Sequence, residues 1–183
     1  MTRAVPTIAS ESPGNFLTGA LWNANIKAMG DFLLGSSSNG VPRFSGYQAT
    51  AQSLSTGVWT SLNIDTELFD SDAGHSTVTN TSRYTATVAG TYAVTATVAF
   101  AANATGIRRV RLAFNGTAVN GTSVGSDAPG GSAQSSAITM SLVQFNGTTD
   151  YVEAQGLQSS GGSLNTSANA DVCPSLRLFW ISS

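Results

Sequence analysis

Few residues in this chain are of the types that perform acid–base or nucleophilic chemistry. The 183 residues include one histidine, His75, and one cysteine, Cys173. A nucleophilic site would have to join these two, but Pro174 directly follows the cysteine and no hydrolase or protease motif surrounds it. Neither a phosphate-binding loop nor a dinucleotide-binding glycine pattern occurs in the sequence. We therefore predict no catalytic residue and no cofactor, and we interpret Cys173 as a small buried hydrophobic residue.

The acidic side chains gather in one segment that could bind a cation. This segment contains Asp65, Glu67, Asp70 and Asp72, and it ends before His75. Oxygen ligands at alternate positions suit calcium, but the segment lacks the order of aspartate, glycine and final glutamate of an EF-hand loop. Aspartates in turns often accept hydrogen bonds from backbone amides, and we expect that role here. The prediction is no metal site, with calcium binding as the alternative.

Charged residues are too scarce to favour binding to nucleic acid or to an anionic membrane. They make up 10% of the chain, and the formal net charge is −2. Arg108, Arg109 and Arg111 form the basic cluster, and we expect Arg109 and Arg111 on the polar face of a strand. Aromatic residues do not interleave with this cluster, and no apolar run approaches the ~20 residues of a membrane span. We expect no nucleic-acid partner and no membrane insertion.

The same composition favours a protein that works as part of an assembly. With 41% hydrophobic residues and few charges, the surface must consist mainly of serine, threonine, asparagine and glycine. Little electrostatic repulsion would keep neighbouring copies apart. This composition indicates a chain that is assembled when it functions.

From about Phe44 to the C-terminus the hydrophobic pattern has the period of two that is typical of β-strands. We expect one buried face for each strand, with Ile138, Met140 and Leu142 turned towards the core. Asn115-Gly116 and Asn146-Gly147 favour type I′ hairpin turns. Similar alternation runs through residues 92–100 and 110–114. Without a second helical segment, these features predict an all-β class and an antiparallel β-sandwich over residues 44–183.

The last strand is predicted to have two apolar faces. Leu176, Leu178 and Trp180 share one face, whereas Phe179 and Ile181 share the other. Because a strand of an antiparallel sandwich usually turns one face to water, the second apolar face needs a cover. A neighbouring subunit is the simplest cover, and a helix predicted over residues 18–34 is the alternative.

The N-terminal segment is predicted to lie outside the sandwich. Residues 1–17 form an extended arm, because Pro6 and Pro13 disfavour a helix. Residues 18–34 form a short α-helix, with Thr18 as its N-cap. Residues 35–43 are rich in glycine and serine and form a flexible linker.

The predicted helix carries one apolar stripe at four-three-four spacing. The stripe consists of Trp22, Ile26, Met29 and Leu33. Since an isolated helix of this length is marginally stable, we expect the stripe to be buried. Copies of itself, the sandwich or another protein could provide the cover.

A series of segments resembles, in the right order, the conserved blocks of the complement component 1q / tumour necrosis factor-like jelly rolls. The blocks are Ser61-Leu62-Asn63-Ile64-Asp65-Thr66-Glu67 with Ala73-Gly74-His75-Ser76, then Arg83 to Tyr92, Val110 to Gly116, Asn146 to Val152, and Leu176 to Ile181. Three further stretches resemble the bacteriophage branch of that family: Leu17 to Asn23, Trp59 to Asp72, and Phe100 to Gly106. The resemblance implies a homotrimeric jelly-roll β-sandwich that is a virion component. It does not imply the calcium sites of some members, because the acidic segment does not match them residue by residue.

The resemblance and the residue patterns together predict a bacteriophage structural protein that is not an enzyme. Its expected location is the virion, as a minor tail or fibre component made in the host cytoplasm. The alternatives are a capsid decoration, a head fibre, or a receptor- or glycan-binding module that would use the polar loops 125–136 and 161–169. For the trimer interface we predict Tyr92, Val94, Leu178, Phe179, Trp180 and Ile181. For docking onto other virion proteins we predict Val5, Ile8, Trp22, Ile26, Met29 and Leu33.

Overall fold

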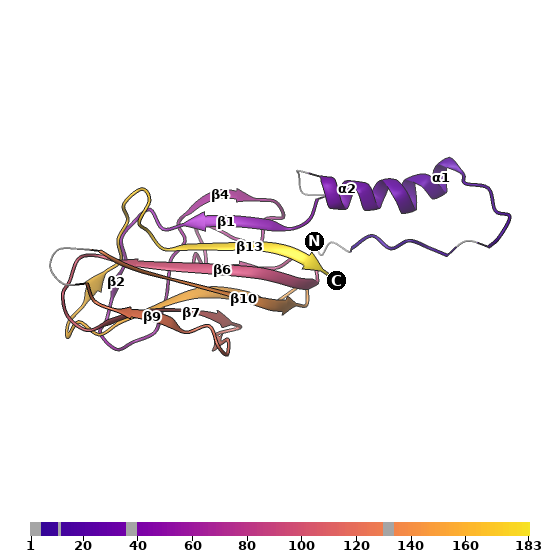
Figure 1. Ribbon diagram of the computed structural model, residues 1–183. Helices are drawn as coiled ribbons and strands as arrows, with labels where there is room; N and C mark the ends of the chain where they lie inside the picture. Colours follow the sequence, from indigo (N-terminus) through magenta and orange to yellow (C-terminus); the bar gives the residue numbers. More distant parts are fainter. Residues whose placement is uncertain (1–4, 11, 36–39, 130–133) are drawn as a thin grey trace.

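The chain folds into two antiparallel β-sheets packed face to face, with a helix and an extended arm projecting from one end (Figure 1). The computed structural model describes residues 5–10, 12–35, 40–129 and 134–183. The architecture confirms the predicted all-β antiparallel sandwich. Residues 36–39 of the predicted linker lie outside the described residues.

One sheet has five strands in the order β10-β6-β13-β1-β4. The strands are β1 (Arg43–Tyr47), β4 (Thr66–Asp70), β6 (Gly90–Phe100), β10 (Ser135–Phe145) and β13 (Ser175–Ser182). The first and last of them in the chain, β1 and β13, pair with each other inside the sheet. The two ends of the sandwich segment are therefore held together by a ladder of backbone hydrogen bonds.

The second sheet follows the order β3-β11-β7-β8, with β5 also paired to β11 and β9 to β7. The strands are β3 (Thr60–Ser61), β5 (Arg83–Thr85), β7 (Ile107–Phe114), β8 (Thr117–Ala118), β9 (Val124–Asp127) and β11 (Tyr151–Gln158). A small separate pair consists of β2 (Ser53–Leu54) and β12 (Leu164–Asn165).

The core lies between the two sheets and takes one face of each long strand. On β6, Tyr92 and Val94 are fully buried, and on β7 the same holds for Val110 and Leu112. The predicted alternation of residues 92–100 and 110–114 is thus confirmed. The hydroxyl of Tyr92 donates to the carbonyl of Val88 at 2.8 Å, so this buried phenol has a hydrogen-bond partner.

The two Asn-Gly turns differ from each other. At Asn115-Gly116 both residues have positive φ, 49° and 79°, which confirms the predicted type I′ turn. At Asn146-Gly147 only the glycine does, and the side chain of Asn146 accepts hydrogen bonds from the amides of residues 148–150. The type I′ prediction for this second turn was wrong. The loop is longer than a two-residue turn. It is closed by hydrogen bonds to the asparagine side chain, in place of the backbone-to-backbone hydrogen bonds of a two-residue turn.

A helix stands off the end of the sandwich and leads towards β1 (Figure 1). It runs without interruption through α1 (Gly19–Leu21), the π-helix η1 (Trp22–Lys27) and α2 (Ala28–Leu34). Thr18 is its N-cap, as predicted, because its hydroxyl oxygen accepts a hydrogen bond from the amide of Leu21 at 3.2 Å. Phe32 is buried and packs edge-on against Trp180, with ring centroids 5.1 Å apart. This aromatic pair fixes the helix to one end of the core.

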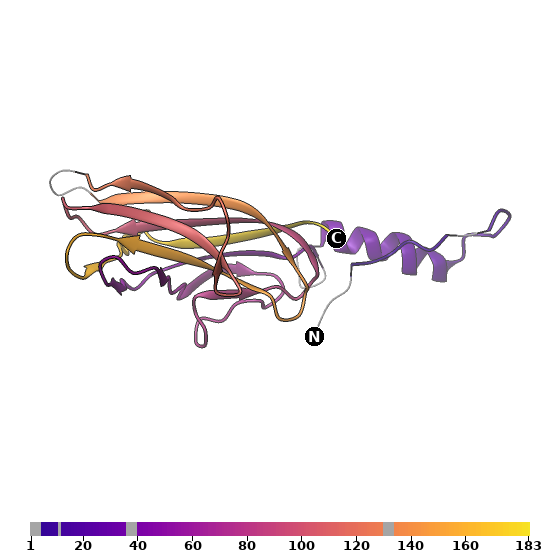
Figure 2. The same cartoon turned by 90° about the horizontal axis from the view of Figure 1, so that it is seen from below.

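The arm runs back along the helix towards the sandwich. Viewed from below, the arm and helix together continue the long axis of the two sheets (Figure 2). The amide of Ala9 donates to the side-chain oxygen of Asn25 at 3.3 Å, and Val5 packs against the core. The arm is therefore tied down at both the helix and the sandwich.

Candidate assembly surface

The middle of strand β10, residues 138–142, presents its apolar side chains to solvent and a polar one, Thr139, to the core. Ile138, Met140 and Leu142 are 59%, 67% and 63% exposed. In contrast, Thr139 is buried, and its hydroxyl donates to the carbonyl of Thr122 at 2.7 Å. The prediction that the three apolar residues face the core was therefore wrong.

The last residues of β10 set its orientation. Val143 and Phe145 lie in the core, and the ring of Phe145 packs edge-on against those of Tyr92 and Phe114, with centroids 4.9 and 5.3 Å away. Because successive side chains of a strand point to opposite faces, burial of these odd-numbered positions turns the even-numbered ones outward. The alternating pattern correctly predicts two unlike faces but does not say which one meets water.

Strand β13 adds a second apolar row to the same sheet face. Phe179 and Ile181 are 52% and 48% exposed, so the two predicted faces of this strand are confirmed. The helix does not cover them, because its Phe32 reaches Trp180 on the core side of the strand. Four residues predicted for the trimer interface are instead buried between the two sheets, in the core of the single chain. They are Tyr92, Val94, Leu178 and Trp180.

Small side chains of β6 separate the two rows and make a valley between them. In the strand register, Leu142 lies opposite Ala93 on β6, and Phe179 lies opposite the same alanine from the other side. An apolar hollow beside this valley is lined by Ala93, Phe179 and, from β4, the half-exposed Phe69. We call the outer side of the five-stranded sheet the assembly face; its large exposed apolar residues are Leu68, Phe69, Ile138, Met140, Leu142, Phe179 and Ile181.

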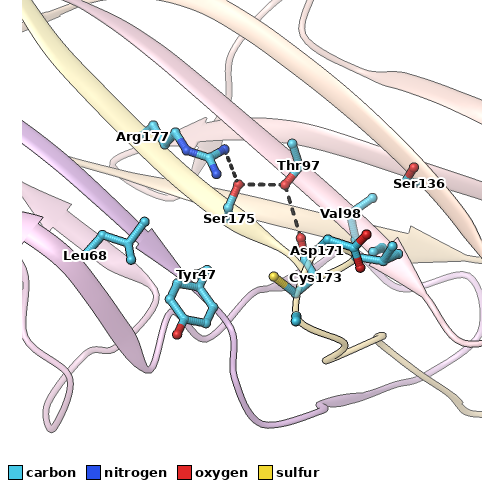
Figure 3. A pocket seen from close by; sticks show the side chains of 12 residues that line it. Tyr47, Leu68, Thr97, Val98, Ser136, Asp171, Cys173, Ser175 and Arg177 are labelled. Carbon is cyan, nitrogen blue, oxygen red and sulfur yellow. Dashed lines mark hydrogen bonds between the residues drawn. The ribbon is translucent and has the colours of Figure 1, made fainter.

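A second hollow, of about 470 Å³, continues the assembly face towards the end opposite the helix (Figure 3). Its floor is a chain of hydrogen bonds in which Arg177 donates to the hydroxyl of Ser175 at 2.8 Å, and that hydroxyl lies 2.7 Å from the hydroxyl of Thr97. Tyr47 and Leu68 form the other wall. The hollow therefore has an apolar wall and a polar floor whose groups bind one another.

The candidate acid–base residues occur in environments that hold turns in place. His75 is buried, with Nδ1 2.7 Å from the carboxylate of Glu67 and Nε2 3.0 Å from the carbonyl of Thr81. Both ring nitrogens are engaged, so neither is free to take a proton from a substrate. Cys173 lines the second hollow, and burial raises the pKa of its thiol, which disfavours the reactive thiolate.

The acidic segment folds into turns in which carboxylates accept hydrogen bonds from backbone amides. Asp65 accepts from the amides of Ala49 and Thr50 at 2.6 and 2.9 Å, and Asp70 accepts from two amides of its own turn at 3.2 and 2.9 Å. Burial acts to raise the pKa of Asp65, but these hydrogen bonds outweigh it and lower the pKa. At Asp70 burial prevails and the pKa is raised. The predicted role as acceptors for backbone amides is confirmed, and no set of three or more His, Cys, Asp or Glu in the described part of the chain is placed to hold a metal ion.

The basic cluster is divided between two faces of the second sheet. Arg109 is exposed, and Arg111 stacks over the ring of Trp59 at 4.2 Å on the outer face, as predicted for both arginines. Arg108 is fully buried and donates to carbonyls of the 103–107 loop. The three arginines therefore form no continuous basic surface.

The N-terminal segment exposes apolar side chains along its length. Of the predicted docking residues, four are exposed, Met29 is half-buried, and Val5 packs partly on the core; the exposed ones are Ile8, Trp22, Ile26 and Leu33. Phe16, which is not among the predicted docking residues, is 89% exposed and lies two residues before the N-cap, in the segment that joins the arm to the helix and forms the tip of the N-terminal segment. The available signal was the pair of apolar residues Phe16-Leu17 directly before the N-cap. None of the described helices is long and apolar enough to cross a membrane.

Comparison with known proteins identifies the fold. No family model and no curated protein matches the chain. The crystal structure of murine APRIL at pH 8.5 matches with a TM-score of 0.57 and 11% identity, covering 76% of this chain and 98% of the murine one. The structure of Eiger TNF from S. frugiperda matches with a TM-score of 0.53 and 10% identity, covering 78% and 92%. These matches show a tumour necrosis factor-like jelly roll, which confirms the predicted fold class.

Proposed function

We propose that this protein is a non-enzymatic structural component that works as a homotrimer joined through the assembly face. Its N-terminal segment attaches it to a larger particle, a bacteriophage virion, as a minor tail or fibre component. The observation that carries the proposal is the orientation of β10, which turns Ile138, Met140 and Leu142 to solvent.

The exposed rows of β10 and β13 flank β6 on one face of the same sheet, with the small Ala93 between Leu142 and Phe179. Isolated apolar residues are common on monomers, but several large ones gathered on one sheet face are typical of an interface. Full burial of one such side chain stabilises by about 1.5–3 kcal/mol. Burial of β10 and β13 side chains together would give an association free energy that a stable complex requires.

The shape of the assembly face favours a ring of copies. The row of large apolar side chains on β10, which we call the ridge, lies at one place on the assembly face. The hollow beside Phe69 and Phe179 lies at another place on the same face. When the ridge of one copy enters the hollow of the next, the contact joins unlike patches, and such contacts form a closed ring if the rotation from copy to copy is a whole fraction of a turn. We set the number of copies at three because the sequence blocks resemble those of trimeric jelly rolls.

The environments of His75 and Cys173, in the part of the chain that the structure describes, support a structural role. The imidazole of His75 is enclosed by Glu67 and Thr81, and burial raises the pKa of the Cys173 thiol. The virion setting is supported by the stretches that resemble bacteriophage jelly rolls and by the exposed apolar tip of the N-terminal segment.

Substitution of one ridge residue tests the trimer. The change Met140→Asp would place a charge in the apolar interface, at a cost of several kcal/mol in assembly free energy. We expect the natural chain to have the mass of three copies at micromolar concentration in light scattering, and the variant to have the mass of one.

The control is Val78→Asp, which introduces the same charge at an exposed apolar residue on a loop away from the assembly face. This variant should remain trimeric, and circular dichroism should show that both variants are folded. A natural chain that is monomeric at micromolar concentration would contradict the proposal.

A further inference from the structure

One side of the N-terminal helix carries an apolar groove that no described segment covers. The groove is lined by Trp22, Ile26, Gly30 and Leu34, with Lys27 and Asp31 on its flank. Its apolar side chains are exposed. The groove keeps Trp22 and Ile26 of the predicted stripe, but its other members lie one residue later than Met29 and Leu33.

The π-helical segment explains this shift. In an α-helix, residues four apart wind slowly around the axis, because a turn contains 3.6 residues. The π-helix η1 has a wider turn with more than four residues, closed by hydrogen bonds to the fifth residue along. Residues four apart therefore drift around its axis in the direction opposite to their drift in an α-helix. Across η1 and α2 the two drifts offset each other, so Trp22, Ile26, Gly30 and Leu34 stay in one line.

The other two sides of the helix already have partners within the chain. Phe32 packs against Trp180 at the end of the sandwich, and Asn25 receives a hydrogen bond from Ala9 of the arm. The groove points away from Phe32, because Gly30 and Leu34 lie about half a turn from it. Neither the sandwich nor the arm can cover the groove in this arrangement.

Gly30 is a further indication of a close neighbour. A glycine in the middle of a helix costs about 1 kcal/mol relative to alanine. Its φ is not positive, and a Cβ built at this position would meet nothing within 4 Å inside the chain. The protein itself thus does not require glycine there, but a second helix that approaches closely would.

The charges on the groove flank are complementary to those of a second copy. Lys27 and Asp31 form a salt bridge within the helix, and both side chains are more than half exposed. In a second copy of the same groove, Asp31 can pair with Lys27 of the first copy, and Lys27 with Asp31. Exchange of the salt bridge within the helix for one between helices leaves every charge with an opposite partner.

We propose that the groove packs against the same groove of two further copies, forming a three-helix bundle that prolongs the trimer beyond the sandwich. The inference rests on the proposed trimer. The helix leads towards β1 and contacts β13, two strands of the sheet that carries the assembly face, and it projects past their end (Figure 1). Copies that join through this sheet therefore bring their helices together at one end.

The bundle assigns different tasks to two parts of the N-terminal segment. Trp22 and Ile26 contact other copies of this chain. Phe16 and Ile8, which lie outside the groove and are exposed, remain for contact with the particle.

A disulfide cross-link tests the bundle in the full-length chain. In a Cys173→Ser background, Gly30→Cys places the only thiol of each copy in the groove. Mild oxidation of the trimeric fraction should link two of three copies rapidly, because cysteines whose Cα atoms lie within about 7 Å can be bridged. The matched control is Asn23→Cys, an exposed position on the same helix outside the groove, which should cross-link much more slowly.

A second variant keeps the test independent of thiol chemistry. Ile26→Gln should raise the concentration at which the trimer dissociates by about tenfold. Because the dissociation constant of a trimer varies with the square of that concentration, this shift corresponds to about 2.8 kcal/mol per trimer. A trimer in which Gly30→Cys cross-links no faster than Asn23→Cys, and in which Ile26→Gln leaves dissociation unchanged, overturns the bundle but not the trimer. A natural chain that is monomeric contradicts the proposed function itself.

Discussion

Polar residues of the β4–β5 loop and of the segment around β5 hold one another in fixed positions. The hydroxyl of Tyr84 donates to Asp72 at 2.8 Å, and the same carboxylate accepts from the hydroxyl of Thr87 at 2.6 Å. Burial raises the pKa of Tyr84, and the negative charge of Asp72 raises it further by a smaller amount. The phenol therefore stays protonated and keeps this hydrogen bond. With His75 held between Glu67 and Thr81, the residue types that suggest chemistry serve here to shape a loop.

Asp65 provides a test of this role at the scale of one residue. Its carboxylate binds two amides, and Asp65→Asn keeps an acceptor for only one of them. We expect the variant to lose about 1.5 kcal/mol of unfolding free energy at pH 7, the low end of the range for a hydrogen bond to a charged group, because Asp65 is only partly buried. Urea unfolding at a fixed protein concentration measures the loss, and Asp171→Asn, at an exposed position, is the control.

The difference in unfolding free energy between the natural chain and Asp65→Asn should depend on pH. Because the folded state lowers the pKa of Asp65 below its ordinary 3.8, the stabilisation is complete above that value. It is lost as the pH falls through the folded-state pKa. The difference between the natural chain and Asp65→Asn should therefore be constant from pH 7 to about pH 5 and shrink below pH 4. A difference that grows on acidification would contradict this account.

The sequence predicts which side chains accept hydrogen bonds from backbone amides, but not which amides donate them. Turn chemistry identifies Asp65 as an acceptor for amides, and the structure agrees. Its partners, Ala49 and Thr50, are more than a dozen residues away in the chain, and only the packing of the sheets brings them close. The Asn146 loop shows the same limit, because a dipeptide preference does not determine loop length.

At the scale of elements, β10 and the helix show where sequence patterns are ambiguous. An alternating strand has two unlike faces, and core partners such as Tyr92 and Phe114, which lie on other strands, decide which face of β10 is buried. The helix was predicted at its correct place, but the apolar line on it depends on the π-helical segment. Neither the orientation of β10 nor the π-helix has a marker in the local sequence.

The contact of Phe32 with Trp180 makes the helix a separable element. In Phe32→Ala we expect the helix to detach while the jelly roll stays folded, because removal of a buried phenylalanine costs about 3 kcal/mol and Phe32 is the buried residue of α2. Hydrogen exchange should become faster in residues 19–34 and remain unchanged in β6 and β13. Leu33→Ala, at an exposed neighbouring position, should change neither. Uniform loss of protection across the sandwich would instead make the helix part of its core.

At the scale of the whole molecule, the N-terminal segment and the C-terminus lie at the same end of the sandwich (Figure 1). The class of fold could be predicted from strand periodicity and from the order of the motif blocks, because both reflect the core. The assembly face could be predicted only at Phe179 and Ile181, since its other strands reveal their exposed side only when the two sheets are packed.

Attachment to a particle is tested at this scale with Phe16→Asp. The variant should remain trimeric in light scattering, because Phe16 lies two residues before the N-cap of the helix and outside the assembly face. We expect it to be absent from purified virions in which antibody labelling locates the natural chain, since the charge would disrupt an apolar contact with the particle. Val78→Asp is again the control and should be incorporated. Normal incorporation of Phe16→Asp would show that this tip makes no essential contact.

The closed core of the single chain has a consequence for the order of events after synthesis. Residues such as Tyr92, Val94 and Leu178 are buried without any contribution from another copy. Folding of the jelly roll is therefore a first-order process that each chain can complete alone, whereas the proposed association through the sheet face would be of higher order and would depend on concentration. Early in expression, when copies are few, folded but unassociated chains should accumulate, and the supply of newly made protein would then set the pace of assembly.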